Sequence, residues 1–250
     1  GTIVYTTNGG VDWTAATTTN VGTASMRGVS MIDANNGVAV GWYGQIVYTT
    51  NGGVDWTDAT TTNVGGTSML GVSMIDANNG VAVGYSGTIV YTTNGGVDWT
   101  AATTTNVGTT SMWGVSMGDA NNGVAVGSSG TIVYTTNGGV DWTAATTTDG
   151  ATHMRGVSMI DASNGVAVGD SGQIVYTTNG GVDWTATTTT SVGDNSMLGV
   201  SMIDASNGVA VGYSGQIVFA GSAPSEVGTV STTTGNTQVE LSWSAPSDNG

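Results

Sequence analysis

The chain has 250 residues and a mass of 24.8 kDa, which suits one large all-β domain or two small ones. It carries 17 acidic but only 2 basic residues, neither of them lysine, for a formal charge of −15. Because nucleic acids and anionic lipids are bound through Lys and Arg, this charge excludes a nucleic-acid-binding protein and one held on membranes by electrostatics. The lack of cysteine excludes disulfides and thiolate chemistry.

Composition also sets expectations about location. An acidic, Lys-free chain rich in Thr is typical of secreted proteins, so we expect an extracellular or cell-surface location. No apolar run approaches the roughly 20 residues of a membrane-spanning helix, so we expect no membrane insertion. The chain starts at Gly1 inside a repeat, without Met or a signal peptide, and we expect a processed chain or a fragment of a longer one.

The sequence repeats itself every 42 or 43 residues. The phrase G-[TQ]-I-V-Y-T-T-N-G-G-V-D-W-T starts at Gly1, Gly44, Gly87, Gly130 and Gly172, and a shortened copy covers 215–219. The phrase G-V-S-M-[IG]-D-A-[NS]-N-G-V-A-V-G starts at Gly28, Gly71, Gly114, Gly156 and Gly199. Repeats of this length, each with four short strands, are typical of β-propeller blades. The predicted fold class is therefore all-β, a β-propeller of about five four-stranded blades.

The first complete unit predicts four strands in chain order, over 28–32, 38–41, 45–50 and 54–62. Each run is short, rich in β-branched residues and bounded by Gly or Asn, and Asn-Gly suits the positive φ angles of a tight hairpin. The chain begins with a third and a fourth strand and ends with a first, second and third. The two ends could complete one mixed blade and close a ring of five with one surplus strand. Residues before Gly1, or another chain, could instead complete a larger ring.

The hairpin between the third and fourth strands carries a recognisable motif. Residues 6–13 read TTNGGVDW and resemble the Asp-box of bacterial neuraminidase repeats, S/T-x-D/N-x-G-x-x-W. We expect a structural role, because Asn can bond turn amides, Gly permits the bend and Trp can fill the space between blades. The Asn, Gly and Trp positions of the five copies are Asn8, Gly10, Trp13, Asn51, Gly53, Trp56, Asn94, Gly96, Trp99, Asn137, Gly139, Trp142, Asn179, Gly181 and Trp184.

The whole repeat resembles the propeller repeats of photosystem II assembly factors and related secreted proteins. The resemblance covers residues 1 to about 220 and implies a β-propeller, to which we assign residues 1–221. It would also imply an assembly chaperone, but the scarcity of Arg and the character of the tail argue against that role.

The tail, 222–250, leaves the repeat. The stretch resembles the first two strands of a fibronectin type III domain at Pro224, Val239, Leu241, Trp243, 245–246 and 248–250. Two strands cannot bury a core alone, so we expect a longer parent protein, or docking of these strands on the propeller or on another chain.

The repeats differ in three places, which are the residue before GVSM, the pair after VAVG and the loop after the fourth strand. Antiparallel order puts all three on one face of the disc, which we call the variable face. Tyr, Trp and Arg often anchor interfaces, and aromatic rings beside Asp or Asn suit sugars, so we predict a ligand or partner face. Neutral sequence drift, in loops that tolerate substitution, would give the same pattern of variable residues. The candidate residues are Arg27, Trp42, Tyr43, Tyr85, Trp113, His153, Arg155 and Tyr213.

The opposite face carries one Asp in the turn after each first strand. Carboxylates beside Asn and backbone carbonyls suit calcium, although turn chemistry alone explains Asp and Asn at such positions. We therefore predict no cofactor and keep calcium as the alternative. The residues concerned are Asp33, Asp76, Asp119, Asp161 and Asp204.

Enzyme chemistry is poorly supported by the residues present. Sialidases resemble this chain only in the box, and they need three arginines, whereas only Arg27 and Arg155 exist here. Both glutamates, Glu226 and Glu240, lie in the tail. His153 is the single histidine, which excludes a His-based zinc site. We predict that the protein is not an enzyme.

These observations favour a non-enzymatic extracellular structural or adhesive propeller that self-assembles into fibres or filaments by strand pairing between chains. The alternative is a lectin-like propeller that binds glycans or proteins through the variable face. The expected partners are further copies of the chain, or other surface proteins and glycans.

Overall fold

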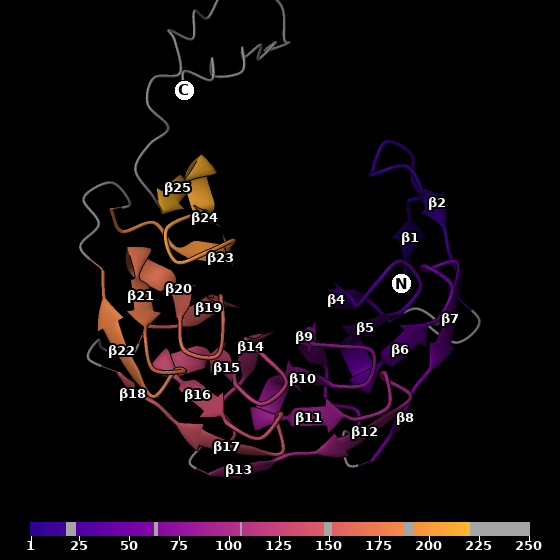
Figure 1. Ribbon diagram of the computed structural model, residues 1–250, viewed down its shortest axis with the longest axis horizontal. Coiled ribbons are helices and arrows are strands. Elements are labelled where there is room, and N and C mark those ends of the chain that lie inside the picture. Colours follow the sequence, from indigo (N-terminus) through magenta and orange to yellow (C-terminus); the bar gives the residue numbers. More distant parts are fainter. Residues whose placement is uncertain (19–23, 63–64, 106, 148–151, 188–192, 221–250) are drawn as a thin grey trace, which may run out of the picture.

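The computed structural model describes residues 1–18, 24–62, 65–105, 107–147, 152–187 and 193–220. These residues form blades that lie side by side in an arc, open on one side (Figure 1). Within them no helix is long and apolar enough to cross a membrane. The predicted all-β propeller fold is confirmed. The predicted fibronectin-like segment, 222–250, lies outside the described residues.

Four blades are complete. The first has β4 (Met26–Met31), β5 (Gly37–Gly41), β6 (Ile46–Thr49) and β7 (Asp55–Asp58). The second has β9 (Met69–Met74), β10 (Gly80–Gly84), β11 (Ile89–Thr92) and β12 (Asp98–Ala101). The third has β14 (Met112–Met117), β15 (Gly123–Gly127), β16 (Ile132–Thr135) and β17 (Asp141–Ala144). The fourth has β19 (Met154–Met159), β20 (Gly165–Gly169), β21 (Ile174–Thr177) and β22 (Asp183–Ala186).

Each blade is an antiparallel meander whose first strand lines the inner side of the arc (Figure 1). The predicted long fourth strand is two elements instead. After the first of them the chain passes to the next blade and pairs there in parallel with its fourth strand, as Thr17 does with Asp55. These crossover strands are β3 (Thr17–Thr18), β8 (Thr60–Thr61), β13 (Thr103–Thr105) and β18 (Thr146–Thr147).

Neighbouring blades pack through one repeated set of contacts. Between the second and third blades, Trp142 is fully buried among Val81 and Ile89 on one side and Val133 on the other. At the inner strands the backbones approach so closely that a Cβ on Gly71 would lie 3.5 Å from Cα of Gly114. The equivalent interfaces lie between the other complete blades.

A serine hydroxyl links each inner strand to the next. The Oγ atom of Ser73 accepts a hydrogen bond of 3.2 Å from the backbone N–H of Met117, and Ser116 receives one of 2.9 Å from Met159. Ser30 and Ser158 make the same bond. These bonds link the inner strands of neighbouring blades directly.

The two ends of the arc are incomplete blades. The fifth blade has β23 (Met197–Met202), β24 (Gly208–Gly212) and β25 (Ile217–Ala220), and the first end has only β1 (Val4–Tyr5) and β2 (Thr14–Ala15). These two sheets pair with each other nowhere in the described chain. The number of five blades is confirmed, whereas the mixed blade expected from the two ends is not formed, and the ends stand apart across the opening (Figure 1).

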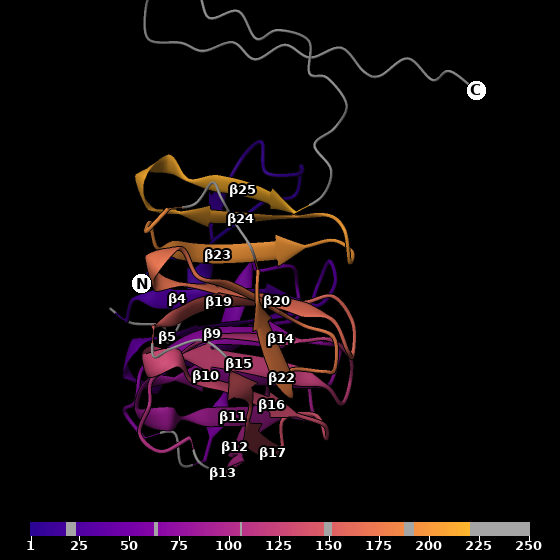
Figure 2. The ribbon, with the colours of Figure 1, turned by 90° about the vertical axis from the view of Figure 1, so that its left-hand side faces the viewer.

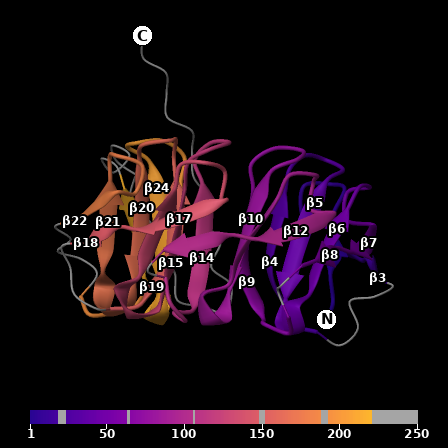
Figure 3. The ribbon, with the colours of Figure 1, turned by 90° about the horizontal axis from the view of Figure 1, so that it is seen from below.

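The strands run across the thickness of the disc, so their connections gather on two faces (Figures 2 and 3). The Asp-box and the turn after the first strand lie together, because the N–H of Gly52 donates to the carbonyl of Asn35 at 2.7 Å. The loop after the second strand lies on the other face, where Trp42 N–H donates to the carbonyl of Ser25. The structure therefore places the residue before GVSM and the pair after VAVG on one face, as predicted, whereas most of the loop after the fourth strand lies outside the described residues.

Candidate functional site

A tight loop after each second strand builds the variable face. Each loop is a 3₁₀ turn whose middle residue has a positive φ without being glycine, such as Tyr43 at 60° and Ser86 at 55°. Such angles are uncommon for non-glycine residues. The loop reaches the next blade, since the N–H of Tyr43 donates to Oγ of Ser68 at 3.2 Å. Side chains from adjacent blades are thereby brought together at each junction.

Arg27, Trp42 and Tyr43 form the first cluster on this face. The guanidinium carbon of Arg27 lies 4.8 Å from the ring centroid of Trp42, which is a cation–π contact. The rings of Trp42 and Tyr43 meet edge to face at 6.3 Å. Arg27 is exposed and Tyr43 is 71% exposed, so both the charge and an aromatic surface face solvent.

Trp113, His153 and Arg155 form the second cluster, at the junction of the third and fourth blades. Arg155 lies 4.3 Å from the ring centroid of Trp113, whose ring also meets that of His153 at 5.0 Å. The Nδ1 atom of His153 accepts a hydrogen bond of 2.9 Å from the N–H of Ser129. The imidazole is thus held between a backbone donor and an aromatic ring.

Asp170 completes the second cluster, although the predicted set omits it. Both of its carboxylate oxygens accept bonds from Arg155, at 2.8 and 3.0 Å. The bond from Arg155 is the main cause that lowers the pKa of Asp170, and it raises the pKa of the guanidinium in turn. The signal in the sequence was the acidic residue after VAVG, where the other repeats have Trp, Tyr or Ser.

The eight predicted residues therefore share one face but do not form one pocket. Six of them make the two clusters. Tyr85 stands exposed in the loop of its own blade, and Tyr213 is exposed in the loop of the fifth blade, from which it interacts electrostatically with Arg155. The charge of Arg155 is neutralised by its ion pair with Asp170. Among the described residues, Arg27 has its cation–π contact with Trp42 but no ion pair. Arg27 is thus the exposed arginine without a carboxylate partner among the described residues.

The Asp-boxes use their polar atoms within their own hairpins. In the second copy, Thr49 Oγ1 accepts from Gly53 N–H, Asn51 Oδ1 accepts from Asp55 N–H, and Trp56 Nε1 donates to the Gly53 carbonyl. Asn51 Nδ2 also donates to the Asp55 carboxylate at 2.8 Å, a partner that the predicted motif omitted. All five boxes make the Trp–Gly and Asn–Asp bonds, which fits a structural role.

The turn aspartates bond to their own turns. The Oδ1 atom of Asp119 accepts from the N–H groups of Asn121 and Asn122, both at 2.7 Å, and these bonds lower its pKa. The pKa values of the other four turn aspartates, Asp33, Asp76, Asp161 and Asp204, are also lowered by turn bonds. No group of three or more His, Cys, Asp or Glu that could hold a metal occurs among the described residues. The absence of a cofactor, with calcium at these turns as the alternative, stays a prediction.

Fold and hairpins together define a β-propeller of Asp-box blades. Residues 60–220 match the family described as "Photosynthesis system II assembly factor YCF48", and the chain belongs to this family. This confirms the resemblance drawn from the repeats. A comparison with curated protein sequences gave no match.

Solved structures match this chain at low identity, and those with a TM-score above 0.5 share its fold. YCF48 from Cyanidioschyzon merolae is 19% identical with a TM-score of 0.61, over 83% of this chain and 70% of that one. "YCF48 bound to D1 peptide" is 16% identical with a TM-score of 0.48, over 79% and 78%. A streptogramin B lyase is 13% identical with a TM-score of 0.63, over 84% and 66%.

The family assignment corrects the predicted location. The expected extracellular or cell-surface location is wrong, because this is a family of photosystem II assembly factors. The adhesive role depended on that location and is not carried further. An assembly-factor family agrees with the prediction of a non-enzymatic protein, whereas the likeness to a lyase shows that this fold also supports enzymes.

Proposed function

We propose that this propeller is a non-enzymatic binding protein that holds a segment of a photosystem II protein at its variable face. The observation that carries the proposal is the gathering there of both arginines, each stacked on a tryptophan. Stacked Arg and Trp side chains present flat, semi-rigid surfaces, which lowers the entropy lost when a partner is bound. Membership of an assembly-factor family supports a protein as the ligand.

The charge distribution favours an acidic group in the partner segment beside Arg27. The chain carries a net charge of −15, so an acidic partner is repelled by most of the surface. Arg27 is exposed and held in place by Trp42, with Tyr43 beside it as an apolar platform. A short segment with a carboxylate next to an apolar or aromatic side chain fits this arrangement, because the guanidinium can take the carboxylate in a bidentate bond.

The second cluster gives a different expectation. Arg155 already donates two bonds to Asp170, and it is flanked by the ring of Trp113. A partner carboxylate would have to compete with Asp170 for the guanidinium. We therefore assign Trp113 a role in apolar contact and Arg155 a role in holding that ring in place.

The test uses labelled peptides of 15 residues, tiled along photosystem II subunits, with binding followed by fluorescence anisotropy. For a peptide that binds, Arg27→Gln should weaken binding at least 10-fold, as loss of an interface anchor costs about 2 kcal/mol or more. Arg155→Gln should have a smaller effect. Ile203→Ser, exposed on the opposite face, is the control and should leave affinity unchanged.

Two results would contradict the proposal. Failure of every peptide to bind would do so, and so would a peptide whose affinity is the same for Arg27→Gln and the unaltered chain. Glycan-array binding that Trp113→Ala abolishes, without any peptide binding, would support the lectin-like alternative instead.

A further inference from the structure

The junction of the third and fourth blades contains a residue that can change its charge near neutral pH. This residue is His153, which directly precedes the first strand of the fourth blade, β19. The equivalent residue of the other four blades is a serine, at Ser25, Ser68, Ser111 and Ser196. Histidine ordinarily changes its charge between about pH 5 and 8, whereas a serine hydroxyl stays neutral. The repeats therefore differ at this position of the variable face by one titratable side chain.

The position that His153 occupies links two blades. At the junction of the first and second blades, the N–H of Tyr43 donates to Oγ of Ser68 at 3.2 Å. At the junction of the third and fourth blades, the N–H of Ser129 donates to Nδ1 of His153 at 2.9 Å, from the equivalent loop η3 (Ser128–Gly130). An imidazole nitrogen thus replaces a hydroxyl oxygen as the acceptor of the same link.

The direction of this hydrogen bond fixes the charge state of His153. A backbone N–H can only donate, so Nδ1 is the unprotonated nitrogen of a neutral ring, whose proton is on Nε2. Protonation places a hydrogen on Nδ1 as well, and an imidazolium has no nitrogen left to accept a bond. The link to Ser129 therefore exists only while His153 is neutral.

The surroundings allow the side chain of His153 to move without its backbone. The carbonyl of His153 accepts a bond of 2.8 Å from the N–H of Asp170, as the carbonyl of Ser25 does from Trp42, so the backbone is held in place. Ser129 is exposed, and water can replace the imidazole as the acceptor for its N–H. Loss of the link thus requires rotation of one half-buried side chain, with the blades still packed together.

Charged groups of opposite sign lie around the imidazole. Arg155 of β19 lies 4.3 Å from the ring centroid of Trp113, and the imidazole meets the same ring at 5.0 Å. Asp170 binds Arg155 through both carboxylate oxygens, and this bond is the largest cause that lowers its pKa, with a smaller contribution from His153. Tyr213 interacts electrostatically with Arg155 from the loop of the fifth blade. Because Arg155 and Asp170 balance each other, a proton on His153 gives this cluster a net positive charge.

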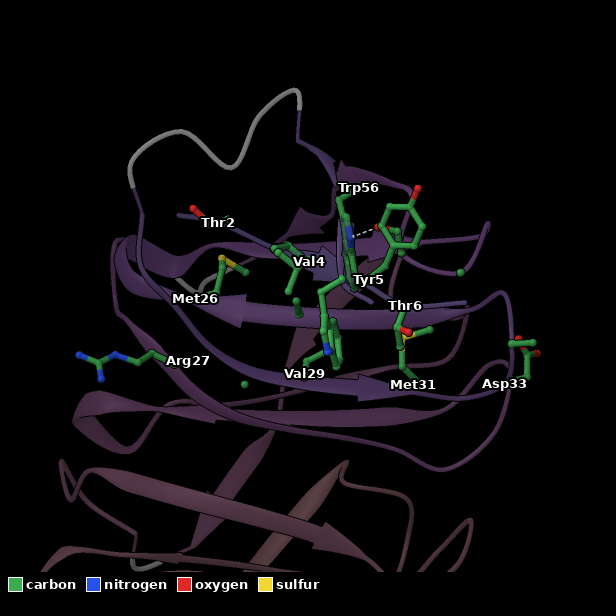
Figure 4. Close-up of a pocket in the computed structure, with 17 residues that line it drawn as sticks. Thr2, Val4, Tyr5, Thr6, Met26, Arg27, Val29, Met31, Asp33 and Trp56 are labelled. Atoms are coloured by element: carbon green, nitrogen blue, oxygen red, sulfur yellow. Dashed lines mark hydrogen bonds between the residues drawn. The ribbon is translucent and has the colours of Figure 1, made fainter. Parts of the chain in front are cut away.

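The junction of the first and second blades provides an internal control. Its link joins a backbone N–H to the hydroxyl of Ser68, neither of which titrates near neutral pH. The cation beside it is Arg27, and an arginine guanidinium stays charged in proteins. Arg27 borders the hollow between the first hairpin and the first blade, and its side chain points away from the other labelled residues (Figure 4).

We propose that His153 makes the link between the third and fourth blades depend on pH. Neutral His153 holds the loop η3 against the fourth blade and packs against the Trp113 ring. When it takes up a proton, His153 releases Ser129 and brings a second positive charge to the ring that Arg155 already contacts, and like charges repel each other. The variable face thereby changes its charge and the position of Trp113 as the medium becomes more acidic. This response belongs to the propeller itself and does not depend on which partner it binds.

Because His153 is the single histidine, NMR spectroscopy of the full, isotopically labelled chain can follow it directly. The shifts of the two imidazole nitrogens show which one carries the proton, and we expect an unprotonated Nδ1 at about pH 8. Between about pH 8 and pH 5, the amide signal of Ser129 and the indole N–H signal of Trp113 should shift with the midpoint of the imidazole. The amide signal of Tyr43 should stay unchanged.

His153→Ser is the matched variant, because it restores the serine of the other four repeats. We expect it to fold like the unaltered chain, since Ser68 makes the same link, and the Ser129 and Trp113 signals should no longer depend on pH. Three results would overturn the proposal. These are a proton on Nδ1 of the neutral ring, a Ser129 amide signal that does not respond while the imidazole titrates, and the same pH-dependent shifts in His153→Ser.

Discussion

The guanidinium carbon of Arg155 lies 4.3 Å from the ring centroid of Trp113, and the two residues belong to different blades. Their contact joins the fourth blade to the third on the variable face. Exposed cation–π pairs contribute about 0.5–1 kcal/mol, and more when desolvated. In a double-mutant cycle of Arg155→Ala and Trp113→Ala, we expect a coupling free energy of about 1 kcal/mol by urea unfolding.

A matched cycle is available in the same face. Arg27 and Trp42 make the equivalent contact at 4.8 Å, but within one blade. Their coupling should be the smaller of the two, because Arg27 is the more exposed arginine and no carboxylate among the described residues orients it. A coupling of zero for Arg155 and Trp113 would show that their contact does not hold the blades together.

The serine links between inner strands give a second prediction. Ser116→Ala removes the acceptor for the N–H of Met159, which then lies unpaired between two blades. A buried unpaired N–H costs about 1–3 kcal/mol, and we expect a loss of unfolding free energy in this range. Ser201 holds the same position on the last inner strand, where no further blade follows in the described chain. Ser201→Ala is therefore the control and should change stability little, and equal losses for the two variants would exclude the link as the cause.

Much of this fold could be predicted from the sequence repeat. Near-identical phrases with Gly and Asn at fixed places predicted four strands per blade, and alternating strand direction placed the variable residues on one face. The crossover strands such as Thr60–Thr61 could not be predicted, because their pairing depends on the next blade and they differ little from the strand before them. The open arc was also unpredictable, since sequence identity between repeats does not give the angle between blades.

Within the variable face, the types of residue were predictable and their pairing was not. Arg27 and Trp42 both occupy positions that vary between the repeats. Their contact could not be predicted, because the folded loop is what places the Trp42 ring against the Arg27 guanidinium. Asp170 was visible as an unusual residue, and its role as partner of Arg155 required the geometry of two adjacent strands. The structural role of the Asp-box tryptophans was predictable. The exposure of Trp13 was not, because it depends on Trp13 lying in a two-stranded sheet, whereas the buried Trp56 lies in a complete blade.

The turn aspartates predict how stability depends on pH. Turn hydrogen bonds hold the pKa of Asp119 below its ordinary value of 3.8. A lowered folded-state pKa means that the stabilisation is present above pH 3.8 and is lost as the pH falls below it. Asp119→Asn should therefore lower the melting temperature at pH 7 and have a smaller effect at pH 3. Asp194→Asn, outside these turns, is the control, and an equal effect of Asp119→Asn at both pH values would contradict the assignment.

Substitutions at two Asp-box glycines, Gly10 and Gly139, can distinguish the cost of backbone strain from the cost of overpacking between blades. Gly139 and Gly10 share a φ of +91°, which side chains rarely adopt. A Cβ at Gly139 would collide with Val81 of the preceding blade, whereas at Gly10 the nearest atom belongs to Trp13, at 3.8 Å. Gly10→Ala should cost about 1–2 kcal/mol, the price of a left-handed residue.

Gly139→Ala should cost a further 1–3 kcal/mol or so, since overpacking forces neighbouring side chains or backbone to shift. Thermal and urea unfolding of the two variants, compared with the unaltered chain, would measure both terms. Equal losses for Gly10→Ala and Gly139→Ala would mean that the second and third blades can separate slightly at no cost. That result would show that the packing of Val81 against the Asp-box of the next blade does not limit the size of the residue at position 139.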